Sequence, residues 1–253
     1  MIGAPALCAR AALRSGAGLV KVAVPASILQ AVVVIEPGAT GIALDDDADT
    51  TMRFLAQGDH VERAVLAVGP GWGVENGRMA LLKLVLIGSR TVVLDADGLN
   101  LLAETARPRP RRGPPLILTP HPGEFRRLAG AIGVRGDPTD EQQRPTAAAE
   151  LADMHDAVVV LKGHRSIVTD GRRCYVNGTG NAALATAGSG DVLTGVIAAL
   201  CAQGMEPFEA AVLATHLHGL GADLWKQQNG AVGLRAMELA DRLPAAIREH
   251  GRG

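Results

Sequence analysis

The chain has 253 residues, of which 25 are basic and 26 acidic, so its formal net charge is −1 at pH 7. Binding to nucleic acid or to an anionic membrane surface requires a positive excess that this chain lacks, so neither is expected as a partner. An apolar fraction of 47% with 20% charged residues excludes a disordered chain. Aromatic residues make up only 2%, so small aliphatic side chains are expected to build the core.

Several features indicate a soluble protein of a reducing compartment, and we expect it in the cytoplasm. The three cysteines are scattered without a CxxC pair, which predicts neither a disulfide framework nor a zinc site: Cys8, Cys174 and Cys201. No secretory signal precedes the first helical segment. The longest apolar stretch, near Val192–Leu200, is shorter than the roughly 20 residues that a membrane span needs. His216 and His218 do not share a helix face, so no metal ligand is predicted.

Short apolar segments alternate with helical ones along most of the chain. Predicted strands are Leu19–Val24, Ala64–Val68, Thr91–Leu94, Leu116–Leu118 and Ala157–Leu161, followed by an antiparallel hairpin of Ser166–Thr169 and Arg172–Val176 joined at Asp170-Gly171. Predicted helices are Ala4–Ser15, Asn76–Ile87, Thr139–His155, Asp191–Gln203, Pro207–Lys226 and Ala236–His250. Continuously apolar strands are typical of a parallel sheet covered on both faces. The sequence therefore predicts one α/β domain over residues 1–253, with a doubly wound, mostly parallel sheet.

A glycine-rich turn opens the helix that begins at Asp191. The backbone N–H groups of Gly188, Ser189 and Gly190 form a ready anion site at this helix N-terminus. Asp191 lies in the first turn, where the helix dipole favours its ionised form by about 0.3–1 kcal/mol. A carboxylate beside an anion site is what phosphoryl transfer to an alcohol requires, with Asp191 as the base and Gly188–Gly190 as the donors.

Three further motifs follow apolar strands: Gly69–Gly73, Leu94–Asn100 and Leu118–Glu124. Each has a structural alternative, since His121 could cap a helix with Pro122 at its first position, and Asp95 and Asp97 could cap a helix near Leu99. Their joint position past the carboxyl ends of strands favours a ligand site at one sheet edge.

Two common nucleotide motifs do not explain the pattern. Gly178-x-Gly180-x-x-Ala183 resembles a dinucleotide fingerprint, but the following segment breaks at Gly188 and no acidic strand end follows. The phosphate loop GxxxxGK[ST] is missing, which excludes a P-loop fold.

Taken together, these motifs closely resemble the ADP-dependent NAD(P)H-hydrate dehydratase family, which has a ribokinase-like fold. The matching segments run in family order over almost the whole chain: Arg14–Val20, Gly69–Gly73, Leu94–Asn100, Leu118–Glu124, Leu161–Gly163, Gly178–Asn181 and Gly188–Asp191. Ser189 and Ser166 stand where the family often has Thr, and both keep a hydroxyl.

The resemblance implies repair of hydrated NADH or NADPH (NADHX or NADPHX) by phosphorylation of the ring hydroxyl and elimination of phosphate, with AMP as the other product. ADP is the implied phosphoryl donor, with ATP possible, and Mg²⁺ is expected although no protein ligand for it is evident. The implied adenine-nucleotide contacts are Lys162, Gly163, His164, Arg165, Ser166 and Gly190. The implied contacts to the hydrated dinucleotide are Ala4, Gly71, His121 and Asp191. A homotetramer and a fused or separate NAD(P)H-hydrate epimerase are also implied.

One departure concerns the start of the chain. Family members have an apolar strand and a Gly-Gly-Ser loop before the helix that opens here at Gly3, so we expect that strand to be missing, by truncation or a misplaced start. Its absence would leave neighbouring strand edges unpaired. Two other functions stay open: a ribokinase-like kinase of a small vitamin-precursor alcohol, and a nucleotide-binding module without activity.

Overall fold

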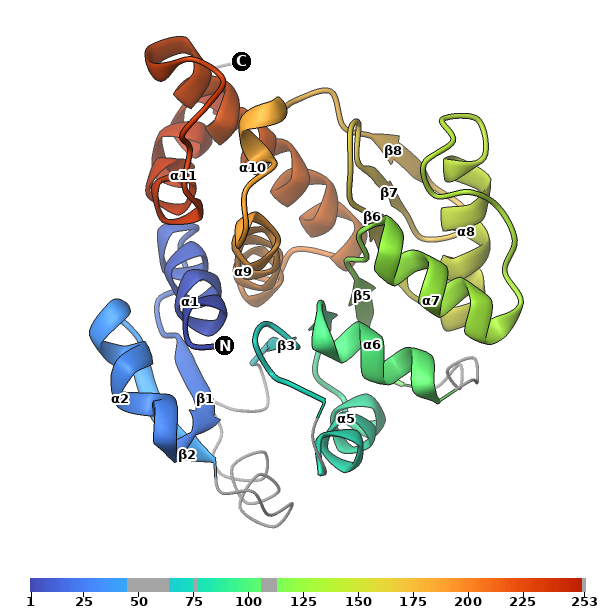
Figure 1. Ribbon diagram of the computed structural model, residues 1–253, viewed down its shortest axis with the longest axis horizontal. Helices are drawn as coiled ribbons and strands as arrows, with labels where there is room; N and C mark the ends of the chain where they lie inside the picture. The colour runs from blue at the N-terminus through green and yellow to red at the C-terminus, as the bar shows by residue number, and fades with distance from the viewer. Residues whose placement is uncertain (45–63, 75–76, 106–112, 252–253) are drawn as a thin grey trace.

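The computed structural model describes residues 1–44, 64–74, 77–105 and 113–251, and contains two sheets among helices (Figure 1). The larger sheet has the strand order β3 (Leu66–Val68), β4 (Val92–Leu94), β5 (Leu116–Leu118), β6 (Val158–Leu161), β7 (Ile167–Thr169) and β8 (Cys174–Val176). Strands β3 to β6 run parallel, and β7 and β8 are added antiparallel. The smaller sheet pairs β1 (Lys21–Pro25) with β2 (Thr40–Leu44) in parallel.

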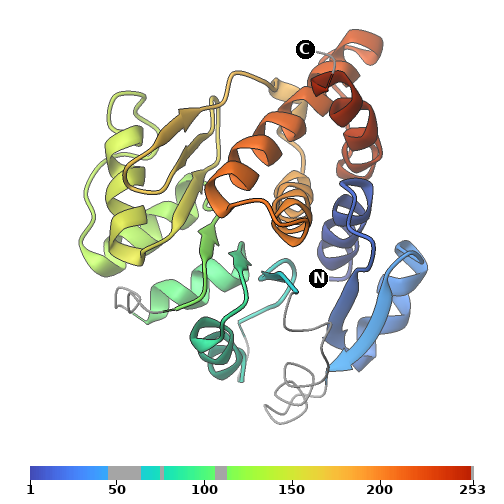
Figure 2. The ribbon, with the colours of Figure 1, turned by 180° about the vertical axis from the view of Figure 1, so that it is seen from behind.

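Helices cover both faces of the larger sheet. One face carries α9 (Ser189–Ala202) and α10 (Pro207–Asn229), with α1 (Gly3–Arg14) and α11 (Ala236–His250) packed outside them, as Figure 2 shows from behind. The other face carries α5 (Arg78–Ile87), α6 (Asp97–Glu104), α7 (Pro122–Ile132) and α8 (Arg144–His155). Helix α2 (Ala26–Ile35) packs on the smaller sheet, and a short 3₁₀ helix, η1 (Ala182–Leu184), precedes α9.

Alternate residues of the same strand supply two separate cores. Val93 and Ile117 point toward α9 and α10, whereas Leu94 and Leu118 point toward α6 and α7, and all four side chains are fully buried. Successive side chains of a strand face opposite sides, so a strand buried on both sides must be apolar throughout. The predicted α/β fold, with a mostly parallel sheet covered on both faces, is confirmed.

The predicted strands and hairpin are present, with boundaries that differ by a residue or two. The hairpin closes through a four-residue loop rather than through two residues alone, because Thr169 pairs with Cys174 and the Asp170 carboxylate accepts hydrogen bonds from the loop amides of Arg172 and Arg173. The helix predicted from Thr139 begins only at Arg144, since Asp140 forms a turn with the next amides.

Two elements of the smaller sheet region, helix α2 and strand β2, were not predicted. Helix α2 contains the run Val32–Ile35, whose β-branched residues favour a strand locally, and the burial of Val32 against α1 and β1 decides for the helix. Asn76, the predicted first residue of α5, lies outside the described residues. None of the helices in the described ranges is long and apolar enough to cross a bilayer.

Close packing of α1 against α9 depends on Gly195. A Cβ atom at this position would lie 2.2 Å from the backbone oxygen of Cys8 and 2.9 Å from the Cβ of Ala11. Replacing Gly195 with Ala is therefore expected to lower the free energy of unfolding by about 1–3 kcal/mol, measured by urea denaturation.

The matched control is Gly130→Ala in α7, where a Cβ atom meets nothing within 4 Å. This change is expected to raise the free energy of unfolding by about 0.5–1 kcal/mol, since alanine is the better helix former. Equal effects of the two substitutions would contradict the close-packing argument.

Candidate active site

Polar residues follow three neighbouring strands at one edge of the larger sheet. Asp95 comes directly after β4, Thr119 after β5 and Lys162 after β6. Ladder bonds continue past the strand ends, since the amide of Thr119 donates to Leu94 O at 3.1 Å and that of Lys162 donates to Pro120 O at 2.9 Å. Carboxyl ends of parallel strands are where open α/β sheets bind ligands.

A buried ion pair joins these strand ends to α9. Lys162 Nζ lies 2.7 Å from Asp95 Oδ1, and Thr194 Oγ1 donates to Asp95 Oδ2 at 2.8 Å. Asp95 is 1% exposed. Burial alone would raise the pKa of Asp95, but the charge and hydrogen bond of Lys162 and the hydroxyl of Thr194 hold it below its usual range. Burial would likewise lower the pKa of Lys162, whereas Asp95 and Glu124, at 3.7 Å, raise it. Both groups are therefore charged.

The first turn of α9 lies over this pair. A Cβ atom at Gly190 would be 3.2 Å from Lys162 Nζ and 3.7 Å from Asp95 Oδ2. Gly188 is the N-cap in the left-handed region, with φ of 88°, and a Cβ atom there would be 2.6 Å from Leu7 Cδ1. A side chain at Gly190 would press on the Lys162–Asp95 pair, whereas one at Gly188 would strain the left-handed backbone and contact Leu7.

The three amides of the predicted anion site differ in their hydrogen bonds. The amides of Gly188 and Gly190 have no hydrogen-bond acceptor among the described residues, as expected for the start of a helix. The amide of Ser189 donates to Thr186 O at 3.3 Å. On the other side, Ser189 O lies 2.9 Å from His218 Nε2, and burial lowers the pKa of His218 to about 4. A neutral His218 with hydrogen on Nε2 therefore ties α10 to the glycine turn.

Asp191, in the first turn of α9, is half-buried and forms no ion pair with another described residue. Burial raises its pKa to about 6, the negative charge of Asp95 adds to the rise, and Lys162 opposes it. A carboxyl that titrates near neutral pH can both accept and return a proton, which is the property of a general base.

His121 caps α7, so the structural alternative for this residue is confirmed. Its Nδ1 accepts from the amides of Gly123 at 2.9 Å and Glu124 at 3.4 Å, and Glu124 Oε2 accepts from the amide of His121 at 2.8 Å. The side chain is still 52% exposed, and its Nε2 lies 3.4 Å from Glu124 Oε1. Asp95 and Asp97, by contrast, do not cap α6. Ala96 is the N-cap of this helix, and the Asp97 carboxylate accepts a hydrogen bond from the amide of Gly73 at 2.8 Å.

The segment Lys162–Ser166 forms a tight exposed turn after β6. Arg165 has φ of 51°, and Ser166 Oγ donates to Gly163 O at 3.0 Å. The guanidinium of Arg144, from α8, donates to His164 O at 2.5 Å and to Leu161 O at 3.3 Å. Gly163, His164 and Arg165 are exposed, whereas the Lys162 side chain turns inward to Asp95.

Ala4 and Gly71, both predicted substrate contacts, lie side by side. A Cβ atom at Gly71 would be 3.2 Å from the Cβ of Ala4, and the amino group of Met1 donates to Gly71 O at 3.1 Å. The structure thus brings together Lys162, Gly190 and Asp191 in one cluster and Ala4 with Gly71 in another. No direct contact joins His121 to either cluster among the described residues, although Glu124 links its helix to Lys162.

The buried carboxylates at this edge already have partners. Asp95 and Glu124 already face the Lys162 ammonium, and Asp95 also accepts from Thr194. Within the ranges that the structure describes, no group of three or more His, Cys, Asp or Glu residues is placed to hold a metal ion. Mg²⁺ commonly keeps several waters and binds through substrate phosphates, so a protein cage is not required.

Comparison with known proteins gives a family for this arrangement. A family model described as NAD(P)H-hydrate dehydratase matches residues 1–245. The chain belongs to the NAD(P)H-hydrate dehydratase family.

Relatives of two lengths accompany this match. The bifunctional NAD(P)H-hydrate repair enzyme of Moorella thermoacetica is 40% identical over 98% of this chain and 47% of that protein, so the chain spans about half of such relatives. The ADP-dependent (S)-NAD(P)H-hydrate dehydratase of Neisseria meningitidis is 41% identical over 97% of this chain and 80% of that protein. The crystal structure of ADP/ATP-dependent NAD(P)H-hydrate dehydratase from Bacillus subtilis, co-crystallized with ATP and Mg²⁺, has a TM-score of 0.82 at 33% identity, covering 98% of this chain and 85% of that chain.

Sequence reasoning did not select several residues that organise this dehydratase-family site. Asp95 and Glu124 lie inside the motifs Leu94–Asn100 and Leu118–Glu124, but the motifs alone assign them no chemical role, and no motif marks Thr194, Arg144 or His218 as a site residue. A signal existed for Asp95, because a carboxylate directly after a fully buried strand needs a buried partner. For Arg144 and His218 the contacts come from helices distant in sequence, and no local pattern marks them.

Replacing Lys162 with Met is expected to lower the free energy of unfolding by about 3–5 kcal/mol at pH 7, because the buried Asp95 carboxylate loses its opposite charge. Because Lys162 holds the folded pKa of Asp95 low, the stability that the pair provides is present at neutral pH and lost as the pH falls through that pKa. The measured difference from the parent protein should accordingly shrink on acidification.

The control is the double variant Lys162→Met with Asp95→Asn, which removes both charges of the pair and should recover most of the loss in urea denaturation. If the changes in the free energy of unfolding of Lys162→Met and Asp95→Asn simply add in the double variant, the two residues do not act as a pair.

Proposed function

We propose that the chain catalyses the ADP-dependent dehydration of hydrated NADH or NADPH, which restores the reduced nicotinamide ring. The observation that supports this most directly is Asp191, with a pKa of about 6, at the start of a helix whose Gly188 and Gly190 amides lack acceptors in the described ranges. Together they offer a base for an alcohol and donors for a phosphoryl group. Family membership and the name of the Neisseria relative support the substrate assignment.

Asp191 is assigned the proton transfer. Its carboxylate takes the proton of the ring hydroxyl as that oxygen attacks the terminal phosphorus of ADP. The bond from this phosphorus to the bridging oxygen breaks, and AMP leaves with the electron pair. The carbon–oxygen bond of the new phosphate ester then breaks, phosphate departs, and the neighbouring ring carbon loses a proton to form the double bond.

The amides of Gly188 and Gly190, on either side of Ser189, are assigned the role of donating hydrogen bonds to the negatively charged oxygens of the transferring phosphoryl group. Removal of one such donor typically raises a barrier by about 2.7–4 kcal/mol. Lys162 stays paired with Asp95 below Gly190, so its positive charge is fixed close to the phosphoryl path. Mg²⁺, when bound to the nucleotide phosphates, would neutralise part of their charge.

Binding roles are divided between the two sides of this turn. The adenine nucleotide is assigned to the exposed turn Gly163–Ser166, which includes His164 and Arg165. Lys162 and Gly190 complete this set of nucleotide contacts. Ala4, Gly71 and His121 are assigned to the hydrated dinucleotide, together with Asp191. We also propose a cytoplasmic homotetramer that acts with a fused or separate epimerase, as the resemblance implies.

The deciding experiment supplies hydrated NADH with ADP, or separately with ATP, and follows recovery of the NADH absorbance band. Recovery with release of AMP and phosphate from ADP is expected. A stable phosphate ester without recovery would instead indicate a kinase of the same fold, and neither product from a folded protein would indicate a module that only binds nucleotides.

Asp191→Asn is expected to lower turnover by about 10²–10⁴-fold and to leave nucleotide affinity nearly unchanged, because the amide keeps the shape but cannot accept a proton. The same change should raise the free energy of unfolding above pH 7 by about 1–3 kcal/mol. The sign follows from the folded pKa of about 6, above the ordinary value of 3.8, which makes ionisation of the folded carboxyl unfavourable. Turnover at the parent rate would remove Asp191 as the base.

The value of kcat/KM should rise with pH and level off above about pH 6, since only ionised Asp191 accepts the proton. Asp97 adds to the raised pKa of Asp191, so Asp97→Asn should move this limb to lower pH, while the amide oxygen can still accept from Gly73. A limb that moves to higher pH, or does not move, would contradict the assignment.

A further inference from the structure

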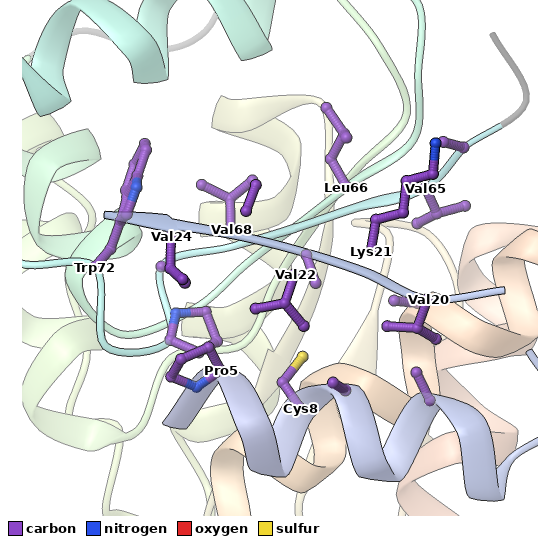
Figure 3. Close-up of a pocket in the computed structure, with 18 of the residues that line it drawn as sticks. Pro5, Cys8, Val20, Lys21, Val22, Val24, Val65, Leu66, Val68 and Trp72 are labelled. Carbon is purple, nitrogen blue, oxygen red and sulfur yellow. The ribbon is translucent and has the colours of Figure 1, made fainter. Parts of the chain in front are cut away.

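Two features of the molecule take no part in the cluster around Asp191. One is a pocket of about 670 Å³ between β1 and β3, whose lining is mostly apolar and includes the labelled side chains of Val22 and Val68 (Figure 3). The other is Arg144, the first residue of α8, which does not line this pocket. Of the two, Arg144 has polar contacts that bear on the candidate site.

Arg144 is a buried cation without a partner of opposite charge. The residue is 6% exposed, and it forms no ion pair with a carboxylate among the residues that the structure describes. Burial lowers the pKa of its guanidinium, and the negative charge of Glu141 opposes this change. A buried charge is costly unless hydrogen bonds satisfy it, so the acceptors of Arg144 indicate what the charge stabilises.

These acceptors are backbone carbonyl groups of the turn that follows β6. The guanidinium donates to His164 O and, at 3.3 Å, to Leu161 O. Helix α8 packs against β6 and β7 (Figure 1), and this packing brings Arg144 to the turn. A Cβ atom at Gly163 would lie 3.2 Å from Arg144 Nη2, so the turn closes tightly over the guanidinium.

Fixing the His164 carbonyl group also fixes the direction of the next amide. In a trans peptide the C=O and N–H groups point in opposite directions, so the N–H of Arg165 points away from the guanidinium. The amides of His164 and Arg165 have no acceptor among the described residues, and both residues are exposed. The turn therefore holds unused backbone donors that a ligand can reach.

The conformation of this turn is strained. Arg165 has φ of 51°, in the left-handed region that residues with a Cβ atom rarely adopt. Such strain persists only where the surrounding structure holds it. The two hydrogen bonds from the planar guanidinium of Arg144 hold the turn from the side of α8.

We propose that Arg144 is a positioning residue for nucleotide binding, whose guanidinium holds the turn Gly163–Ser166 so that its free backbone N–H groups face the adenine nucleotide. This inference rests on the proposed assignment of that turn to the nucleotide. Donors that are already aligned bind an acceptor without the entropy cost of ordering the turn. Loss of Arg144 is therefore expected to weaken nucleotide binding rather than to slow the chemical step.

Arg144→Lys is the variant that tests this role, because lysine keeps the charge but lacks the planar fork that reaches two carbonyl groups at once. Its affinity for ADP, measured by calorimetry, is expected to fall about tenfold, and its KM for ADP to rise by a similar factor. Its kcat at saturating ADP should stay within about twofold of the parent value. A fall in kcat with unchanged KM and unchanged ADP affinity would overturn the proposal.

Leu151→Ala is the matched control on the same helix. Leu151 is fully buried in the core under α8, so its truncation leaves a cavity and should lower the Tm at least as much as Arg144→Lys does. Its affinity for ADP should nevertheless stay within about twofold of the parent value. Equal losses of ADP affinity in the two variants would give Arg144 a merely structural role and overturn the proposal.

Trypsin supplies a readout that needs neither nucleotide nor hydrated NADH. The enzyme cleaves after arginine, and cleavage after Arg165 requires the turn to open locally. The fragment that begins at Ser166, quantified by mass spectrometry, should appear about tenfold faster in Arg144→Lys than in the parent, and Leu151→Ala should stay near the parent rate. Equal rates in the parent and Arg144→Lys would overturn the proposal.

Binding of ADP by the parent protein separates this inference from the proposed function. If the parent binds ADP and Arg144→Lys binds it equally well, the positioning role is wrong and the proposed function stands. If the parent does not bind ADP, both the nucleotide assignment and the inference that rests on it are wrong.

Discussion

The candidate site depends on one buried ion pair. Lys162 and Asp95 come from the ends of β6 and β4, and their contact lies directly under the first turn of α9. Because Asp95 also accepts from Thr194, one carboxylate fixes the lysine, the helix and the sheet edge relative to one another. The negative charge of Asp95 also adds to the effect of burial in raising the pKa of Asp191, so the carboxylate that holds the turn in place also acts on the proton affinity of its half-buried neighbour.

The sequence predicted the larger sheet well because its strands are buried on both faces. Such strands must be apolar throughout, and runs such as Thr91–Leu94 and Ala157–Leu161 have that property without any knowledge of their partners. The β1–α2–β2 region was harder, since the valine run of α2 favours a strand locally and becomes helical only through packing on α1. Helix α8 began later than predicted because the turn at Asp140 competes with the helix for backbone amides.

The candidate site was predicted to the extent that its chemistry lies within contiguous motifs. The glycine turn at Gly188–Gly190 and the position of Asp191 could be derived from helix physics, whereas the inward turn of Lys162 could not, since its partner lies 67 residues away in the chain. His121 illustrates the limit of a motif, because the same side chain that the family resemblance assigns to substrate caps α7 through Nδ1 and lies beside Glu124 through Nε2.

The gap between β1 and β3 divides the molecule into regions of unequal cooperativity. Within the described residues, β1, α2 and β2 share a small core of their own with Ala6 and Ala9 of α1, and no ladder of backbone hydrogen bonds connects them to the larger sheet. Among the described residues this region packs on the rest mainly through α1, so it can open without global unfolding and its amides are expected to exchange with solvent as a separate foldon. Helix α1, which carries Ala4, would then lose part of its packing well before the protein loses the core that carries Asp95 and Lys162.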